Sequence, residues 1–152
     1  MAKRTVSGLE DHIGYWLRFV SNHVSHAFAV KVERRGVTVA EWVLLRQLQS
    51  SGPIAPSRLA EEMGMTRGAI SKLIDRLCEK ALVERTVADG DRRFQSVALT
   101  SGGSKLVPAL ARLADENDAE FFGHLAAKDR TLLVRVLQEI VRRNGWKDVP
   151  VQ

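Results

Sequence analysis

One stretch, residues 56–100, constrains the fold of this 152-residue chain more than any other. Its apolar spacing predicts a short helix, a tight turn at Gly64, and a longer helix that begins after Thr66. The pattern then alternates with period two over residues 83–87 and 96–100, which predicts two strands joined by a turn. A short helix, a turn, a longer helix and a hairpin form the pattern of a winged helix-turn-helix.

Long helices are predicted on both sides of this module. Apolar residues recur at spacings of three and four over residues 9–35, 102–125 and 127–143. Another helix should begin after Thr38, because Glu41 three residues later completes a capping box. The fold class is therefore mainly α with a small β wing, in a single domain over residues 1–152.

The first and last helices are unusually apolar on their surfaces. The first carries four aromatic residues in a chain that is only 6% aromatic, namely Tyr15, Trp16, Phe19 and Phe28. The last carries two adjacent apolar lines. Surfaces of this kind often pair with another chain. The tail after residue 144 is also apolar, with Trp146, Val149 and Val151, and is expected to pack against another apolar surface.

Composition excludes several classes. The chain is 45% apolar and 27% charged, which is typical of a globular protein. A single cysteine allows neither an intrachain disulfide nor a cysteine zinc cage. No apolar run is long enough to span a bilayer and the first residues lack a signal core, so a cytoplasmic protein is expected. The net charge of +5 fits a polyanionic partner. Residues 53–100 are nearly neutral, so DNA binding must depend on where the basic groups lie.

The helix that follows Thr66 has the chemistry of a recognition helix. An α-helix fits the major groove, and its N-terminal residues reach the base edges. The candidate DNA-binding residues of this helix are Thr66, Arg67, Gly68, Ser71, Lys72 and Arg76. Arg67 can bind a guanine or a phosphate, and Gly68 lets the backbone approach closely. The alternative is an ordinary solvated face of an amphipathic helix.

The tip of the hairpin is a second candidate DNA contact. Arg92 and Arg93 are flanked by Asp89 and Asp91, and an arginine at such a tip can enter the narrow minor groove. The neighbouring carboxylate of Asp91 would orient the guanidinium by a bidentate pair. The alternative is a solvated turn whose ion pairs contribute little.

Residues 9–143 resemble the MarR family of bacterial transcription factors. The resemblance is carried by LAEEMGMTRGAISKLIDRLCEKALVER and by DRRFQSVALTSGG. The second segment is similar to the family pattern D-x-R…LT-x-x-G, matched by Asp91, Arg93, Leu99, Thr100 and Gly103. One position departs from the pattern: Ala81 stands where the family commonly has a glycine.

The resemblance implies a homodimer whose first and last helices interlock, bound to double-stranded DNA at a palindromic operator. It divides the chain into a DNA-binding region (37–100) and a dimerisation region (9–36 and 101–149). It also implies a repressor released by a small aromatic or anionic effector, in the cytoplasm and associated with the nucleoid. Residues expected near the effector pocket are Trp16, Phe19, His23, Trp42 and Arg46. Core or dimer packing is the alternative for the tryptophans.

Other sensing roles have weaker support. His12, His23 and His26 lie on the first helix without a matching set of carboxylates or cysteines, so no metal site is expected. Peroxide sensors of the family use a cysteine in the first helix, whereas Cys78 lies late in the recognition helix. A metal- or redox-responsive member of the family remains an alternative.

Two other classes of protein compete with a DNA-binding regulator. A winged-helix module for protein interaction would keep the fold without reading DNA, although it would have no need for basic groups at both Arg67 and the wing tip. An enzyme is not expected, because no nucleophile–base pair, phosphate-binding loop or metal signature occurs. No cofactor is expected either.

Overall fold

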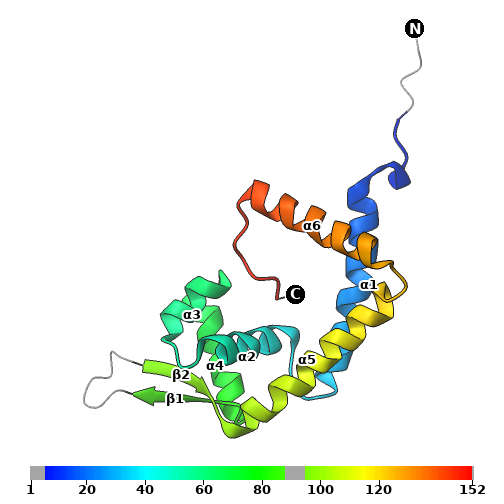
Figure 1. Ribbon diagram of the computed structural model, residues 1–152. Helices are drawn as coiled ribbons and strands as arrows, with labels where there is room; N and C mark the ends of the chain where they lie inside the picture. The colour runs from blue at the N-terminus through cyan, green and yellow to red at the C-terminus, as the bar shows by residue number, and fades with distance from the viewer. Residues whose placement is uncertain (1–5, 88–94, 152) are drawn as a thin grey trace.

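The computed structural model describes residues 6–87 and 95–151. Helices dominate it, and the described strands form a two-stranded antiparallel sheet (Figure 1). The predicted fold class is therefore confirmed. In chain order, the elements are η1 (Leu9–Asp11), α1 (Ile13–Glu33), α2 (Val39–Ser51), α3 (Pro56–Met63), α4 (Arg67–Glu79), β1 (Val83–Val87), β2 (Gln95–Leu99), α5 (Ser101–Phe122) and α6 (Ala127–Asn144).

The first long helix starts later than the sequence predicts. Leu9–Asp11 form a separate 3-10 turn, and His12 has an extended backbone before α1 begins at Ile13. Local hydrogen bonds favour this break. The Asp11 carboxylate accepts from Gly8 N–H at 2.7 Å, and the His12 ring lies 2.8 Å from the Gly8 carbonyl. Both side chains therefore compete with a continuous helix.

The predicted capping box at the start of α2 is confirmed. Thr38 Oγ1 accepts from the Glu41 amide at 3.2 Å, and Glu41 Oε2 accepts from the Thr38 amide at 3.0 Å. The Glu41 side chain is only 1% exposed. Its charge is balanced by Lys80, whose Nζ donates to the same Oε2 at 2.7 Å. A buried carboxylate needs such a partner, and this one ties the start of α2 to the end of α4.

The helix-turn-helix follows the local signals of the sequence. Pro56 occupies the first turn of α3, and Gly64 ends that helix with a positive φ of 63°. Thr66 then caps α4, its Oγ1 accepting from the Ala69 amide at 3.1 Å. The predicted inward faces of both helices are buried: Leu59, Ala60 and Met63 on α3, and Ile70, Leu73, Ile74 and Leu77 on α4.

The wing is a regular antiparallel hairpin where it is described. Val83 pairs with Leu99 at its base and Val87 with Gln95 at its outer end. A backbone bridge between Ile54 and Val97 adds a short third segment along β2. Val83, Val97 and Ile54 are buried, so the base of the wing belongs to the hydrophobic core.

The junction between α4, the wing and α5 explains part of the LT-x-x-G pattern. Thr100 caps α5 by accepting from the Gly103 amide at 3.1 Å, and its hydroxyl donates to the Ala81 carbonyl at 2.7 Å. A Cβ on Gly103 would lie 2.1 Å from the Leu82 carbonyl oxygen, so only glycine fits there. Ala81 has a φ of +55°, a left-handed conformation that glycine adopts more easily.

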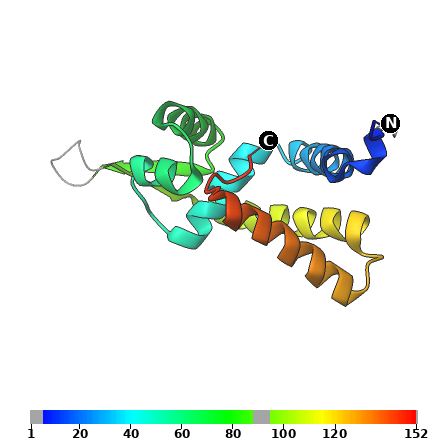
Figure 2. The ribbon, with the colours of Figure 1, turned by 90° about the horizontal axis from the view of Figure 1, so that it is seen from above.

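A small polar cluster joins α1 to α5. Asn117 is buried, and its side-chain amide donates to the Val24 carbonyl at 3.2 Å. Lys31 Nζ donates to Asn117 at 2.9 Å and to Glu120 at 2.7 Å. These bonds fix the two helices against each other, and both views show them side by side (Figures 1 and 2).

The last helix contrasts with the rest. None of the residues of α6 is buried. Its apolar residues are among the large exposed ones, namely Leu132, Leu133, Val134, Val136, Leu137, Ile140 and Val141. The outer half of α1 is similar, with Ile13, Trp16, Leu17, Phe19 and Val20 exposed. Among the described residues, no helix is long and apolar enough to cross a membrane.

Candidate nucleic-acid interface

Helix α4 presents one polar face to solvent. Its four buried residues pack into the core, and all six candidate residues lie on the exposed side: Thr66, Arg67, Gly68, Ser71, Lys72 and Arg76. The structure therefore brings together every helical residue that the sequence singled out. A basic and hydroxyl-bearing face at the N-terminal half of an exposed helix can reach the edges of bases and the phosphates beside them.

The start of α4 is open as well as capped. A Cβ built on Gly68 would meet nothing within 4 Å. The backbone of the first turn is therefore accessible, and amides at a helix N-terminus attract phosphate oxygens. Arg67 is also exposed, so a polyanion approaching the first turn meets a guanidinium and free backbone together.

An acidic residue on this face was not among the sequence candidates. Asp75 on α4 pairs with Arg85 on β1, with 2.7 Å between Oδ1 and Nη1. This ion pair links α4 to the first strand of the wing and helps to fix the angle between them. Asp75 could have been identified in the sequence as a carboxylate in the middle of an otherwise basic helix face.

The candidate residues at the wing tip, Asp91, Arg92 and Arg93, lie outside the described residues. The strands that lead to the tip are described up to Val87 and from Gln95. The hydroxyls of Thr86 and Ser96 are hydrogen-bonded across the hairpin. The two strands of the wing are therefore paired up to Val87 and Gln95, the last described residue on each side (Figure 1).

The five candidate effector residues fall on two helices. Trp16, Phe19 and His23 are exposed on α1, where the Phe19 and His23 rings are tilted by 50° to each other with centroids 5.1 Å apart. Trp42 is half-buried on α2 against the core, and Arg46 on the same helix donates to Ser50 Oγ at 2.8 Å. Their joint role in a pocket stays a prediction.

The histidines and the cysteine are not gathered into one site. His12, His23 and His26 are all exposed on or beside α1, and Cys78 is half-buried against the hydrophobic core. Within residues 6–87 and 95–151, no group of three potential metal ligands was found.

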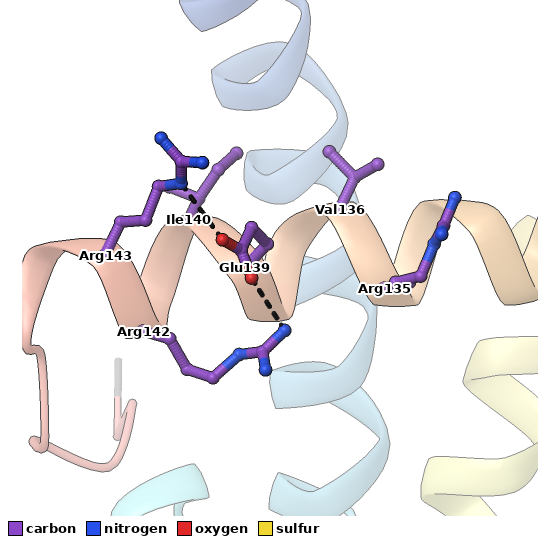
Figure 3. Close-up of a pocket in the computed structure, with 6 residues that line it drawn as sticks. All are labelled: Arg135, Val136, Glu139, Ile140, Arg142 and Arg143. Atoms are coloured by element: carbon purple, nitrogen blue, oxygen red, sulfur yellow. Dashed lines mark hydrogen bonds and ion pairs between the residues drawn. The ribbon is translucent and has the colours of Figure 1, made fainter.

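Two surface hollows lie on α6. The larger is lined by Arg135, Val136, Glu139, Ile140, Arg142 and Arg143. Glu139 pairs with Arg142 at 2.8 Å and with Arg143 at 3.0 Å, while Val136 and Ile140 project on one side of the helix (Figure 3). The lining therefore combines two apolar side chains with three arginines and one glutamate. Apolar residues and arginines together are typical of protein–protein interfaces.

Comparison with known proteins gives a consistent family. The model described as the MarR family matches residues 35–93, which include α2, α3, α4 and β1. The transcriptional repressor NicR of Pseudomonas putida is 24% identical over 131 residues, covering 86% of this chain and 83% of the relative.

Two solved structures are similar over most of the chain. A mutant of MarR from Escherichia coli complexed with operator DNA has a TM-score of 0.74 at 23% identity, covering 85% of this chain and 93% of that one. CouR from Rhodococcus jostii bound to p-coumaroyl-CoA has a TM-score of 0.75 at 26% identity, covering 89% of this chain and 95% of that one.

Proposed function

The chain belongs to the MarR family, and from this premise we propose that it is a homodimeric, DNA-binding transcriptional regulator. It binds a palindromic operator and represses transcription until a small aromatic or anionic ligand releases it. Residues 37–100 read the DNA, and residues 9–36 with 101–149 form the dimer. The protein works in the cytoplasm, at the nucleoid, and has no catalytic role.

The observation that carries this proposal is the exposed face of α4. Its six candidate residues are solvent-exposed along a helix whose opposite side is buried in the core. That arrangement supports insertion of the N-terminal half of α4 into the major groove, with Arg67 and Ser71 at base edges. Lys72 and Arg76 would then neutralise phosphates.

A second copy of the chain is the partner that best fits the exposed apolar residues of α1 and α6. One protomer reads one half-site, so a two-fold dimer matches a palindromic operator. The apolar residues left exposed on both helices are contiguous along each helix, as expected of a surface that another chain covers.

An aromatic carboxylate or its coenzyme A thioester is the proposed class of effector. The bound p-coumaroyl-CoA in the structure of CouR is one example from a related protein. In this chain, the proposed pocket residues are Trp16, Phe19, His23, Trp42 and Arg46. Aromatic walls with a guanidinium suit an aromatic anion. Screening such compounds for release of bound DNA would identify the effector.

The test of DNA reading begins with selection of duplexes from a randomised pool by the full-length protein. The selected duplex is then titrated by fluorescence anisotropy at several salt concentrations. We expect a two-fold symmetric sequence, tight binding, and an affinity that falls steeply with salt as counterions are released. No enrichment, or an affinity independent of salt, would contradict the proposal and favour the protein-interaction module.

The wing contributes a separate prediction. Arg93→Ala should weaken operator binding without changing the dimer or its thermal stability, because the side chain is proposed to enter the minor groove. Anisotropy with the selected duplex measures the loss, and sedimentation checks the dimer. An affinity equal to that of the wild type would exclude a minor-groove role for Arg93.

A further inference from the structure

The C-terminal tail, residues 145–151, turns back from α6 toward the helix-turn-helix (Figure 1, red). The reversal has a local cause. Gly145 ends α6 with a positive φ of 65°, and its amide donates to the Arg142 carbonyl at 3.1 Å. The Trp146 amide donates to the Val141 carbonyl at 3.3 Å. These two bonds make a Schellman motif, which stops the helix and redirects the chain.

The tail then contacts the end of α3. The Val149 amide donates to the Met63 carbonyl at 3.4 Å. Met63 is the last residue of α3, and the last four carbonyls of a helix have no partner within it. The tail therefore supplies one of the missing donors. Val149 is half-buried, and Val151 packs against the core of the DNA-binding region.

The contact extends to the turn itself. A Cβ on Gly64 would lie 2.4 Å from Asp148 Oδ1 and 2.8 Å from Asp148 Cα. The tail backbone is thus seated directly against Gly64, the residue whose left-handed conformation ends α3. Only Met65 and the cap residue Thr66 separate this glycine from Arg67, the first residue of α4.

We infer that the tail is a positioning strap, in which residues 148–151 hold the turn between α3 and α4 and so fix where the recognition helix begins. No side chain of α6 is buried in the chain's own core. The tail connects α6 to Met63 and Gly64, so a movement of α6 can be transmitted to the helix-turn-helix through it. A shift of α6, on dimerisation or ligand binding, would pull on Gly64 through the tail. The effect on operator binding rests on the proposed function, whereas the effect on the turn does not.

A pair of variants at one position isolates the strap. Val149→Pro removes the amide that donates to Met63, and Val149→Ala keeps the amide while shortening the side chain. Both are made in the full-length protein, which keeps α6 and the dimer surface intact. Hydrogen–deuterium exchange over residues 65–70 reports on the turn and on the first turn of α4, without any need for DNA.

Val149→Pro should speed exchange over residues 65–70 by about two- to tenfold, the factor expected for one lost hydrogen bond. Val149→Ala should change it less. The wild type and both variants should have the same oligomeric state in sedimentation experiments. For the selected duplex, the affinity of Val149→Pro should fall by a similar factor, because a looser recognition helix must be ordered on binding.

The possible outcomes separate the strap from the proposed function. Wild-type exchange in Val149→Pro, or equal changes in both variants, would overturn the strap whatever the DNA result. Faster exchange confined to Val149→Pro supports it even if no duplex is ever selected, in which case only the proposed function fails. Faster exchange with undiminished operator affinity would overturn its role in positioning the recognition helix.

Discussion

The two parts of this molecule differ in how completely one chain can bury them. The region from α2 to β2 has its own core, in which Leu44, Leu45, Leu59, Met63, Ile70, Ile74, Leu77 and Val97 are almost fully buried. By contrast, α6 buries none of its residues and α1 buries only Val32. Because leaving apolar side chains in water costs free energy, the exposed faces of α1 and α6 are expected to be covered by a partner.

This difference in burial suits the two parts to different functions. A region with a full core can hold a recognition helix rigidly, which reading a base sequence requires. A region whose apolar surface awaits a second chain can instead set the distance between two such helices. Asn117 and Lys31 join α1 to α5 within the chain, so the partner meets a surface that is already ordered.

The largest expected effect comes from charging the uncovered face of α6. The double variant Val136→Asp with Ile140→Asp should raise the dissociation constant of the dimer more than about 100-fold, since each carboxylate would be buried without a partner. Sedimentation equilibrium measures it, and circular dichroism should show unchanged helix content. Lys128→Asp, an exposed position on the same helix, is the control. A double variant that stayed dimeric would place the interface elsewhere.

The region from α2 to β2 can be destabilised from its border, where the first turn of α5 packs against Leu82. Gly103→Ala should lower the free energy of unfolding by about 2–3 kcal/mol, because overpacking against rigid backbone strains the fold. Its new Cβ would lie 2.1 Å from the Leu82 carbonyl oxygen. Gly102→Ala is the matched control, since its Cβ would stand 3.5 Å from the Ala81 carbonyl oxygen. Urea denaturation of both should show a loss at residue 103 alone; equal stabilities would refute the close approach.

Arg67→Ala separates function from stability within the region from α2 to β2. Arg67 is exposed, so its loss should leave the free energy of unfolding nearly unchanged. Operator affinity should fall by about 1–3 kcal/mol if the guanidinium contacts a guanine. Glu61→Ala, also exposed but on α3, is a suitable control. Anisotropy with single-base variants of the selected duplex tests the contact, because losing a base contact should relax the preference at one position. A uniform loss across all sequences would indicate a phosphate contact instead.

What could be predicted from the sequence depends on how far apart the interacting residues lie in the chain. Thr38, Thr66 and Thr100 each cap a helix by bonding an amide three residues on, so their roles follow from local spacing. The buried stripes of α3 and α4 follow from helical periodicity. The exposed face of α4 was predictable for the same reason, because helical periodicity places its residues opposite the buried ones.

The remaining contacts were not predictable, because they join residues that only the tertiary fold brings together. Glu41 was expected to cap α2, but its pairing with Lys80 spans two helices. Asp75 and Arg85 likewise meet only because β1 folds back beside α4. The apolar tail was expected to dock on something, yet nothing local in the sequence points to Met63 and Gly64 as its seat. The break before Ile13 was missed because side-chain hydrogen bonds override the apolar spacing there.

The smallest expected effect concerns Ala81, where the sequence departs from the MarR-family pattern. Ala81 follows the last turn of α4 with a φ of +55°, and it is the one non-glycine residue with a positive φ among residues 6–87 and 95–151. Ala81→Gly should therefore stabilise the protein by about 0.5–1 kcal/mol, because glycine adopts this conformation without crowding by a Cβ. The gain is limited by the greater freedom of glycine in the unfolded chain.

The matched control for Ala81→Gly is Ala69→Gly. Ala69 lies in the first turn of α4 with ordinary helical geometry, so glycine there should destabilise by about 0.5–1 kcal/mol. Thermal denaturation should thus shift in opposite directions for the same substitution. If both variants were destabilised, relief of strain at position 81 would be too small to outweigh the entropy of glycine. Alanine at position 81 would then not lower the stability of the junction between α4 and the wing.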